Sequence, residues 1–264
     1  MKYADVHCHI QFEQYATDDT PLITRMKEEE VAGIVVGVDL ESSKKAIALA
    51  NKYEHLYASV GLHPNRTEEP FSVDEYRALA MHPKVVGIGE CGLDYFRPAD
   101  ANAEVKRAQK ELLEKHIALA VELDKPLIIH GRPSKGTQDA YTDLIEILTT
   151  AKREHPNLCG DIHFFVGGTA EAQAFITLGF TLSFTAVITF ARDYDQVIQS
   201  VPLANILSET DSPYVAPASR RGQRNDPLAV IEVAQKIAHI RGENEEVVRE
   251  ALVENAARMF KITA

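Results

Sequence analysis

Two histidines separated by a single residue stand near the start of the chain, in the run 3–9 (YADVHCH). Side chains in a β-strand alternate between its two faces, so His7 and His9 should point the same way and Cys8 should point away. Two imidazoles that converge from one strand end form half of a metal site. A strand end with two incidental histidines explains the motif equally well, so the rest of the chain must supply the other ligands.

Further metal-binding residue types follow other short apolar runs. Each stands where a buried strand would end, and together they add two imidazoles and two carboxylates. Such groups packed closely would have strongly shifted pKa values unless cations balanced them. The residues are Glu90, His130, His163 and Asp211, after apolar runs that begin at 85, 126, 158 and 205.

The number of these ligands favours two divalent ions. The set is too large for one ion that keeps a position open for water. Two ions about 3.5–4 Å apart that share a carboxylate would use every member. Imidazole ligands favour zinc, while carboxylates and a phosphate substrate leave magnesium and manganese open. We assign His7, His9 and Asp211 to the first ion, His130 and His163 to the second, and Glu90 to both as the bridge.

Short apolar runs alternate with amphipathic runs along the chain, and these elements must bring the ligands together. Near-continuous apolar strands are typical of a parallel sheet buried on both faces. The count of strand–helix units predicts a (β/α)8 barrel, a single domain over 1–264, with its active site at the carboxyl ends of the strands. A doubly wound open sheet is the alternative, with fewer strands and one crevice. The predicted strands are 3–7, 33–38, 56–61, 85–89, 126–130, 158–163, 180–184 and 205–207.

Composition places limits on location and partners. The chain has 264 residues, 45% of them hydrophobic, and three scattered cysteines, which argue against a disulfide framework. It shows no signal-peptide pattern and no apolar run near the roughly 20 residues that span a bilayer. We therefore expect a cytoplasmic monomer without membrane contact. The net charge of -11 argues against a protein that wraps nucleic acid over a wide surface, because such proteins are normally basic, so we expect any nucleic acid to be held locally.

The run 87–92 (GIGECG) matches a dinucleotide-binding fingerprint, G-x-G-x-x-G. That fingerprint needs a helix N-terminus directly after it, to receive the pyrophosphate. Here the residues 93–98 intervene, and Glu90 would face the pyrophosphate. The glycines are better explained by a tight backbone path beside the site. The chain also has no G-x-S-x-G elbow, so a serine hydrolase is not indicated.

With these residues in this order, the sequence resembles the TatD-type deoxyribonucleases, which are barrels of the amidohydrolase superfamily. The resemblance runs in order along nearly the whole chain. It implies a metal-dependent hydrolase that removes nucleotides from DNA ends with magnesium, manganese or zinc, and it implies the same ligand set. The segments that carry it are 5–9 (DVHCH), 61–64 (GLHP), 89–95 (GECGLDY), 126–130 (PLIIH), 163–167 (HFFVG), 209–214 (ETDSPY) and 254–260 (ENAARMF).

The chain departs from the pattern of this family at positions next to the ligands. Phe164 and Val166 replace a cysteine and a serine or threonine, and Asn65 replaces a second histidine. The loop 131–136 (GRPSKG) is also unusual. None of these positions is an expected ligand, so the departures bear on substrate preference.

The expected reaction is attack of water on a phosphodiester of DNA, at single-stranded or 3′ ends. Asp211 would orient the water and accept its proton, and Glu90 would complete the catalytic pair. Asp5, two residues before His7 and on the same face, is expected to be an acceptor behind the ligands or a structural acid, not a ligand, and Glu209 is expected to orient a histidine. Substrate contacts are expected from His63, Asn65, Tyr95, Arg97, Arg132 and Arg224, the last in a basic cluster with Arg220 and Arg221.

The same residues are compatible with two other functions. The first is an amide, ester or lactone hydrolase, including one that deacylates aminoacyl-tRNA. It would use the same metal ions to hydrolyse a different bond. Arg132 and the basic cluster favour phosphate over this alternative. A metal-dependent binding protein without turnover is disfavoured, because these ligands leave open coordination positions on two ions.

Overall fold

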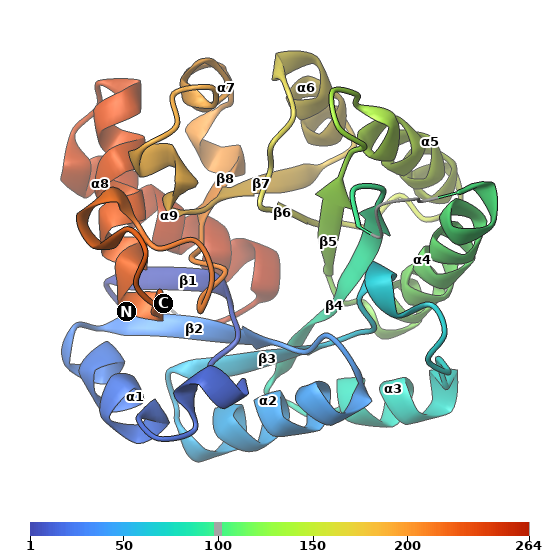
Figure 1. Ribbon diagram of the computed structural model, residues 1–264, viewed down its shortest axis with the longest axis horizontal. Coiled ribbons are helices and arrows are strands. Elements are labelled where there is room, and N and C mark those ends of the chain that lie inside the picture. Colours follow the sequence, from blue (N-terminus) through green and yellow to red (C-terminus); the bar gives the residue numbers. More distant parts are fainter. Residues whose placement is uncertain (98–101, 264) are drawn as a thin grey trace.

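A computed structural model describes residues 1–97 and 102–263. Its strands form one sheet in the order β1 to β8, and every neighbouring pair is parallel. Figure 1 shows the helices as a ring around these strands. The strands are β1 (Tyr3–Cys8), β2 (Val31–Val36), β3 (Leu56–Val60), β4 (Val85–Asp94), β5 (Leu127–Arg132), β6 (Gly160–His163), β7 (Phe180–Phe184) and β8 (Ile206–Ser208).

The sheet closes on itself between its first and last strands. The backbone N–H of Asp211 donates to the carbonyl of His7 at 2.9 Å, and the N–H of His9 donates to the carbonyl of Ser212 at 2.8 Å. The result is the predicted (β/α)8 barrel. The helices are α1 (Asp19–Glu28), α2 (Leu40–Lys52), α3 (Val73–Ala80), α4 (Ala103–Leu123), α5 (Asp139–Glu154), α6 (Thr169–Thr177), α7 (Asp195–Ser200), α8 (Val230–Arg241) and α9 (Glu245–Phe260).

An apolar cluster fills the barrel below the predicted site. Val6 of β1, Ile128 of β5 and Leu207 of β8 belong to it, together with Phe260 of α9. Since β1 and β5 stand on opposite sides of the barrel, their side chains meet only through its interior. The predicted ligands on these strands come later in the chain than the apolar residues. The site therefore lies on top of a packed apolar layer, towards the carboxyl ends of the strands.

Several predicted strand boundaries were wrong by one or two residues, and the end of β4 was wrong by more. β2 begins at Val31 rather than at position 33, and β4 continues past position 89 to Asp94. The extension of β4 depends on glycines. Gly89 and Gly92 have φ values of 147° and 137°, and a Cβ on either would collide with the backbone of β5. Without side chains there, β4 approaches β5 closely and stays paired beyond Glu90.

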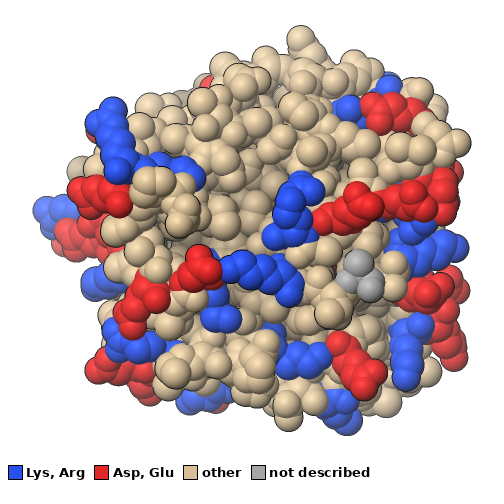
Figure 2. Space-filling view, turned by 180° about the vertical axis from the view of Figure 1, so that it is seen from behind, with Lys and Arg blue, Asp and Glu red and all other residues tan. Residues whose placement is uncertain are grey.

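The outer surface carries mixed charges. Seen from behind the view of Figure 1, acidic and basic side chains stand next to one another and form no broad basic surface (Figure 2). No helix within residues 1–97 and 102–263 has the length and apolar character that crossing a membrane requires.

Candidate metal centre

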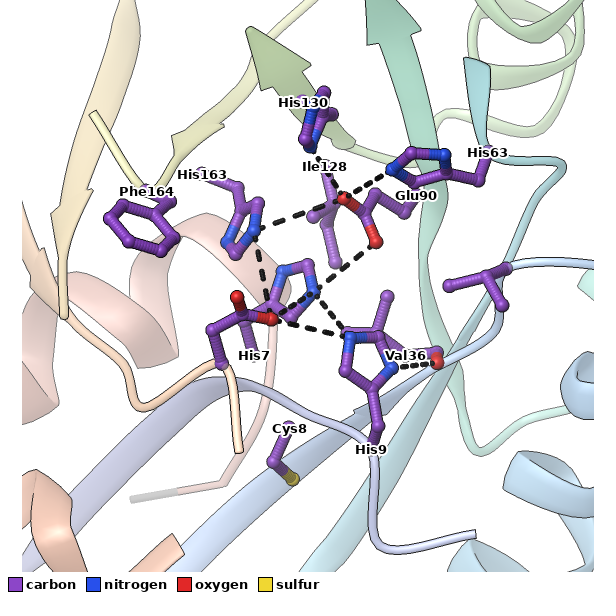
Figure 3. A network of polar contacts seen from close by, with 12 residues as sticks. His7, Cys8, His9, Val36, His63, Glu90, Ile128, His130, His163 and Phe164 are labelled. Atoms are coloured by element: carbon purple, nitrogen blue, oxygen red, sulfur yellow. Dashed lines mark hydrogen bonds and ion pairs between the residues drawn. The ribbon is translucent and has the colours of Figure 1, made fainter. Parts of the chain in front are cut away.

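The ends of four strands and the segment after β8 bring the predicted ligands together (Figure 3). The histidines of β1, β5 and β6 surround the carboxylate of Glu90 on β4, and Asp211 approaches from the loop after β8. Cys8 points away from this group, as the alternation in β1 predicts. Most of the group is buried, and His130 and Asp211 are partly exposed.

Three ligand atoms are spaced as they would be around one ion. Nε2 of His7 lies 3.2 Å from Nε2 of His9, and Oδ1 of Asp211 lies 3.4 Å from the latter and 3.9 Å from the former. Ligands about 2.1 Å from a tetrahedral ion stand about 3.4 Å from one another. These residues therefore fit a divalent cation.

Glu90 belongs to two further groups of close ligand atoms. One contains His7 and His163, and the other contains His63 and His130. Its Oε1 lies 2.9 Å from Nδ1 of His130 and 3.8 Å from Nε2 of His163, while its Oε2 lies 3.5 Å from Nε2 of His7. A carboxylate with both oxygens engaged on different sides suits a bridge. His130 and His163, which we assigned to one ion, fall in different groups here.

Hydrogen bonds identify which nitrogens are available to metals. Nδ1 of His9 donates to the carbonyl of Val36 at 2.8 Å, so its Nε2 presents a lone pair to the centre. His63 has the opposite arrangement. Its Nδ1 accepts the backbone N–H of Asn65 at 3.1 Å, so the proton of its neutral ring is on Nε2, which faces Oε1 of Glu90 at 3.5 Å. His63 is thus a hydrogen-bond donor in this arrangement, and no ligand.

The pKa values show how these charges depend on one another. Burial favours neutral imidazoles, but Asp94 and Glu90 raise the pKa of His130 to about 9. Burial also opposes the charge of His163, yet Glu209, Asp211 and Glu90 raise its pKa to about 10. Burial works against the Glu90 carboxylate too, and the histidines around it hold its pKa well below the usual range. Protons on the histidines thus balance the acids, and divalent cations can take that place.

A buried chain of polar groups supports His163 from behind. Nδ1 of His163 donates to Oε2 of Glu209 at 2.9 Å, and the N–H of Phe164 donates to Oε1 at 2.7 Å. The hydroxyl of Ser183 lies 2.7 Å from Oε2 of Glu209 and 2.5 Å from Oδ2 of Asp161. Glu209 therefore orients a histidine, as expected, and it is itself held in place by the N–H of Phe164 and the hydroxyl of Ser183.

Asp5 is a structural acid and no ligand, which is one of the two roles expected for it. The register between β1 and β2 shifts between Asp5 and Cys8, which interrupts the alternation from which we placed Asp5 on the histidine face. Its carboxylate accepts the backbone N–H of His7 at 3.3 Å and both the N–H and the hydroxyl of Thr210, at 2.9 and 2.6 Å. Asp5 thus joins β1 to the segment after β8 and contacts no imidazole within the described residues.

A cavity of about 860 Å³ opens above the metal centre. It reaches from His9, Glu90 and His163 to the loops after β3, β4 and β5. Among the expected substrate contacts, it is lined by His63, Asn65, Arg97 and Arg132.

Two expected substrate contacts lie elsewhere. Tyr95 is buried and its hydroxyl donates to Asp143 at 2.7 Å. Arg224 pairs with Asp18 at 2.5 Å and lies over the ring of Tyr15. Both side chains have partners inside the protein and neither lines the cavity. These two predictions were wrong because sequence spacing does not show which internal partner a side chain finds.

The other two arginines of the basic cluster also have partners inside the protein. Arg220 pairs with Asp226 at 2.7 Å, and Arg221 lies over the ring of Phe190 at 3.7 Å. Neither arginine lines the cavity.

Several residues of the cavity were missed from the sequence. Asp94 accepts a hydrogen bond from the side chain of Asn65 at 2.9 Å and lies 3.3 Å from Nε2 of His130. It stands four residues after Glu90, so it shares the face of that residue once β4 is known to continue. Lys135 and Phe96 also line the cavity, and no local signal in the sequence marks them.

Comparisons with known proteins agree with this architecture. The family model described as TatD related DNase matches residues 4–261. An uncharacterized metal-dependent hydrolase of Bacillus subtilis, YabD, is 37% identical over 98% of both chains. A 3′-5′ ssDNA/RNA exonuclease of Citrobacter rodentium, TatD, is 29% identical over 98% of both chains.

Solved structures show the same similarity in three dimensions. The crystal structure of YjjV, a TatD homologue from Escherichia coli, superimposes with a TM-score of 0.88 over 99% of both chains, at 28% identity. The match of the family model over almost the whole chain decides the assignment. The chain belongs to the TatD-related family of metal-dependent hydrolases.

Proposed function

We propose that the protein is a deoxyribonuclease that hydrolyses phosphodiester bonds near the ends of single-stranded DNA. The observation that carries this proposal is the cavity, which joins the ligand cluster to the cations Arg97, Arg132 and Lys135. Its volume of about 860 Å³ has room for more than the scissile group alone. A chain of phosphates next to the ions would meet positive charge along its path. The Citrobacter relative, named as an exonuclease, agrees with this substrate.

The residues around the cluster take complementary roles. Divalent ions held there would make a water more acidic and offset the charge of the phosphate. The carboxylate of Asp211 opens on the cavity, and the histidines hold its pKa below the ordinary value although burial works against its charge. Asp211 is therefore ionised, as a group that takes a proton from the attacking water must be. His63 lines the cavity, and its Nε2–H, which faces Glu90 at 3.5 Å, would be a donor to a phosphate oxygen bound there.

Substrate tests separate this proposal from its rivals. Purified protein is incubated with end-labelled single-stranded DNA and with amide and ester substrates, including an aminoacyl-tRNA, in the presence of Mg²⁺, Mn²⁺ or Zn²⁺. We expect nucleotides to be released from the DNA. Ester or amide turnover without any DNA cleavage would refute the nuclease. Binding of these substrates without any turnover would favour a binding protein.

Two substitutions test the catalytic centre. Glu90→Gln and Asp211→Asn keep the side-chain shape and remove the charge, so each should lower turnover by at least about a hundredfold while circular dichroism stays unchanged. Asp74→Asn, on an exposed face of α3, is the matched control and should keep full activity. Activity retained in both site variants would contradict the two-metal proposal.

A further inference from the structure

Exposed aromatic rings line the cavity above the ligand cluster. Phe96 and Tyr214 are 43% and 48% exposed, and both line this cavity. Within the described residues, the only other large apolar side chains so exposed are Met81, Phe190 and Val247. Apolar surface that gathers at a cavity marks a place that another molecule covers.

One of these rings is already part of a stack. The guanidinium carbon of Arg132 lies over the ring of Phe96, 4.2 Å from its centroid. Phe96 stays 43% exposed beside this arginine, so part of its surface is in contact with solvent. Arginine and aromatic faces are the surfaces on which proteins stack single-stranded bases.

The backbone holds this pair in place. Asp94 accepts the N–H of Phe96 at 3.0 Å and that of Arg97 at 2.8 Å, which fixes the turn after β4. The N–H of Tyr95 donates to the carbonyl of Arg132 at 2.8 Å, which joins this turn to the end of β5. A surface that is ordered before its ligand arrives loses less conformational entropy on binding.

The stack stands next to the reacting position. Arg132 follows His130 by two residues on β5, so both side chains lie on the same face, roughly 7 Å apart along the strand. This distance is comparable with one nucleotide unit of an extended strand. Lys135, in the loop that follows, also lines the cavity and adds positive charge for a phosphate.

We propose that Phe96 and Arg132 form a stacking subsite for the unpaired nucleobase adjacent to the scissile phosphodiester. This inference rests on the proposed function and specifies how the substrate is selected. A base in a duplex has both faces covered by its neighbours, whereas a base at a single-stranded end can add to the stack. Because every base has a π-face, the subsite selects unpaired nucleotides with little preference among bases.

The test combines deletion of the base with deletion of the ring. Two single-stranded oligonucleotides are identical except that one has an abasic residue second from the cleaved end. For the wild-type protein, loss of the base should weaken binding and kcat/KM by about 5- to 150-fold. Phe96→Ala should weaken binding and kcat/KM for the intact oligonucleotide to a similar extent. For the abasic oligonucleotide it should cause little further loss, because both deletions remove the same interaction.

Variants of the ring and of a second stack provide the controls. Phe96→Tyr should restore the sensitivity to the base, and Phe96→Leu should not. Phe190 is 38% exposed and lies under Arg221 at 3.7 Å, but it does not line the cavity. Phe190→Ala is therefore the matched control and should respond to the abasic residue as the wild type does.

Binding and cleavage distinguish failure of the subsite from failure of the function. Affinity is measured by fluorescence anisotropy on the whole protein, so it gives a result whether or not the DNA is cleaved. Equal affinity of the wild type for the two oligonucleotides, or strictly additive effects of the two deletions, would overturn the subsite. Absence of cleavage with a preserved preference for the intact oligonucleotide would overturn the nuclease and leave the subsite supported.

Discussion

At the residue scale, the state of each side chain depends on partners distant in sequence. His9 and His63 illustrate this, because backbone groups of Val36 and Asn65 decide which ring nitrogen carries the proton. One histidine then faces the cluster with a lone pair and the other with a donor. Residue type alone would make both of them candidate ligands.

The contact between Glu209 and His163 leads to a prediction about metal affinity. Glu209→Gln removes a charged acceptor that fixes the ring, and we expect it to lower metal affinity about 10- to 100-fold. Isothermal titration calorimetry with Zn²⁺ or Mn²⁺ measures this directly. Glu114→Gln, on an exposed position of α4, should leave the affinity unchanged. Unchanged affinity in a folded Glu209→Gln protein would show that His163 is oriented without its help.

At the scale of the elements, α4 supports the loop that carries His63. His116 of α4 is buried, its Nδ1 donates to the carbonyl of Leu112 at 2.8 Å, and its Nε2 accepts the N–H of Leu62 at 3.0 Å. Burial lowers the pKa of His116 from 6.5 to about 4, although the bond to Leu112 works in the other direction. The neutral ring thus joins the helix to the loop after β3.

This pKa predicts a particular dependence of stability on pH. Between pH 6.5 and about 4 the unfolded chain binds a proton at His116 that the folded protein does not. The contribution of the neutral ring is therefore complete above pH 6.5 and is lost as the pH falls towards 4, by about 3 kcal/mol in total. In His116→Gln, the free energy of unfolding in urea should vary less with pH over this range.

An exposed histidine provides the control for this measurement. His239→Gln, on the exposed side of α8, should keep the pH dependence of the wild type. A free energy of unfolding that falls equally steeply in His116→Gln and in the wild type would contradict this role of His116.

At the scale of the whole molecule, the DNA substrate that we propose would bind to an acidic protein, so its phosphates would need local positive charge. The net charge is -11, and the cations that line the cavity are few. Figure 2 shows that the face seen there does not add a broad basic surface. Binding should therefore involve few phosphates, and it should be less sensitive to salt than binding by a basic wrapper.

This predicts a shallow salt dependence. If Arg97, Arg132 and Lys135 each contact one phosphate, the logarithm of the association constant should fall with the logarithm of salt concentration with a slope of about −2. Fluorescence anisotropy of a short single strand on Asp211→Asn measures it. Lys135→Gln should reduce the slope by about 0.7, and the exposed Lys45→Gln should not. A slope near −7 would require about ten contacts and would contradict local binding.

The sequence by itself determined the barrel and the group of ligand-type residues at its strand ends. In a parallel barrel all carboxyl ends open on one face, so the positions of His7, Glu90, His130, His163 and Asp211 along the strands suffice to bring them together. This inference needs only the alternation of strands and helices. It does not depend on how any one side chain is packed.

Only the tertiary structure decided which other side chains reach the cavity. Tyr95 and Arg224 have the right chemistry for a substrate contact, but Asp143 and Asp18 hold them elsewhere. Phe96, with no local signal in the sequence, lies under Arg132 at the cavity. The physical reason is that a side chain takes the best partner among all its neighbours, and those neighbours are set by the packing of distant segments.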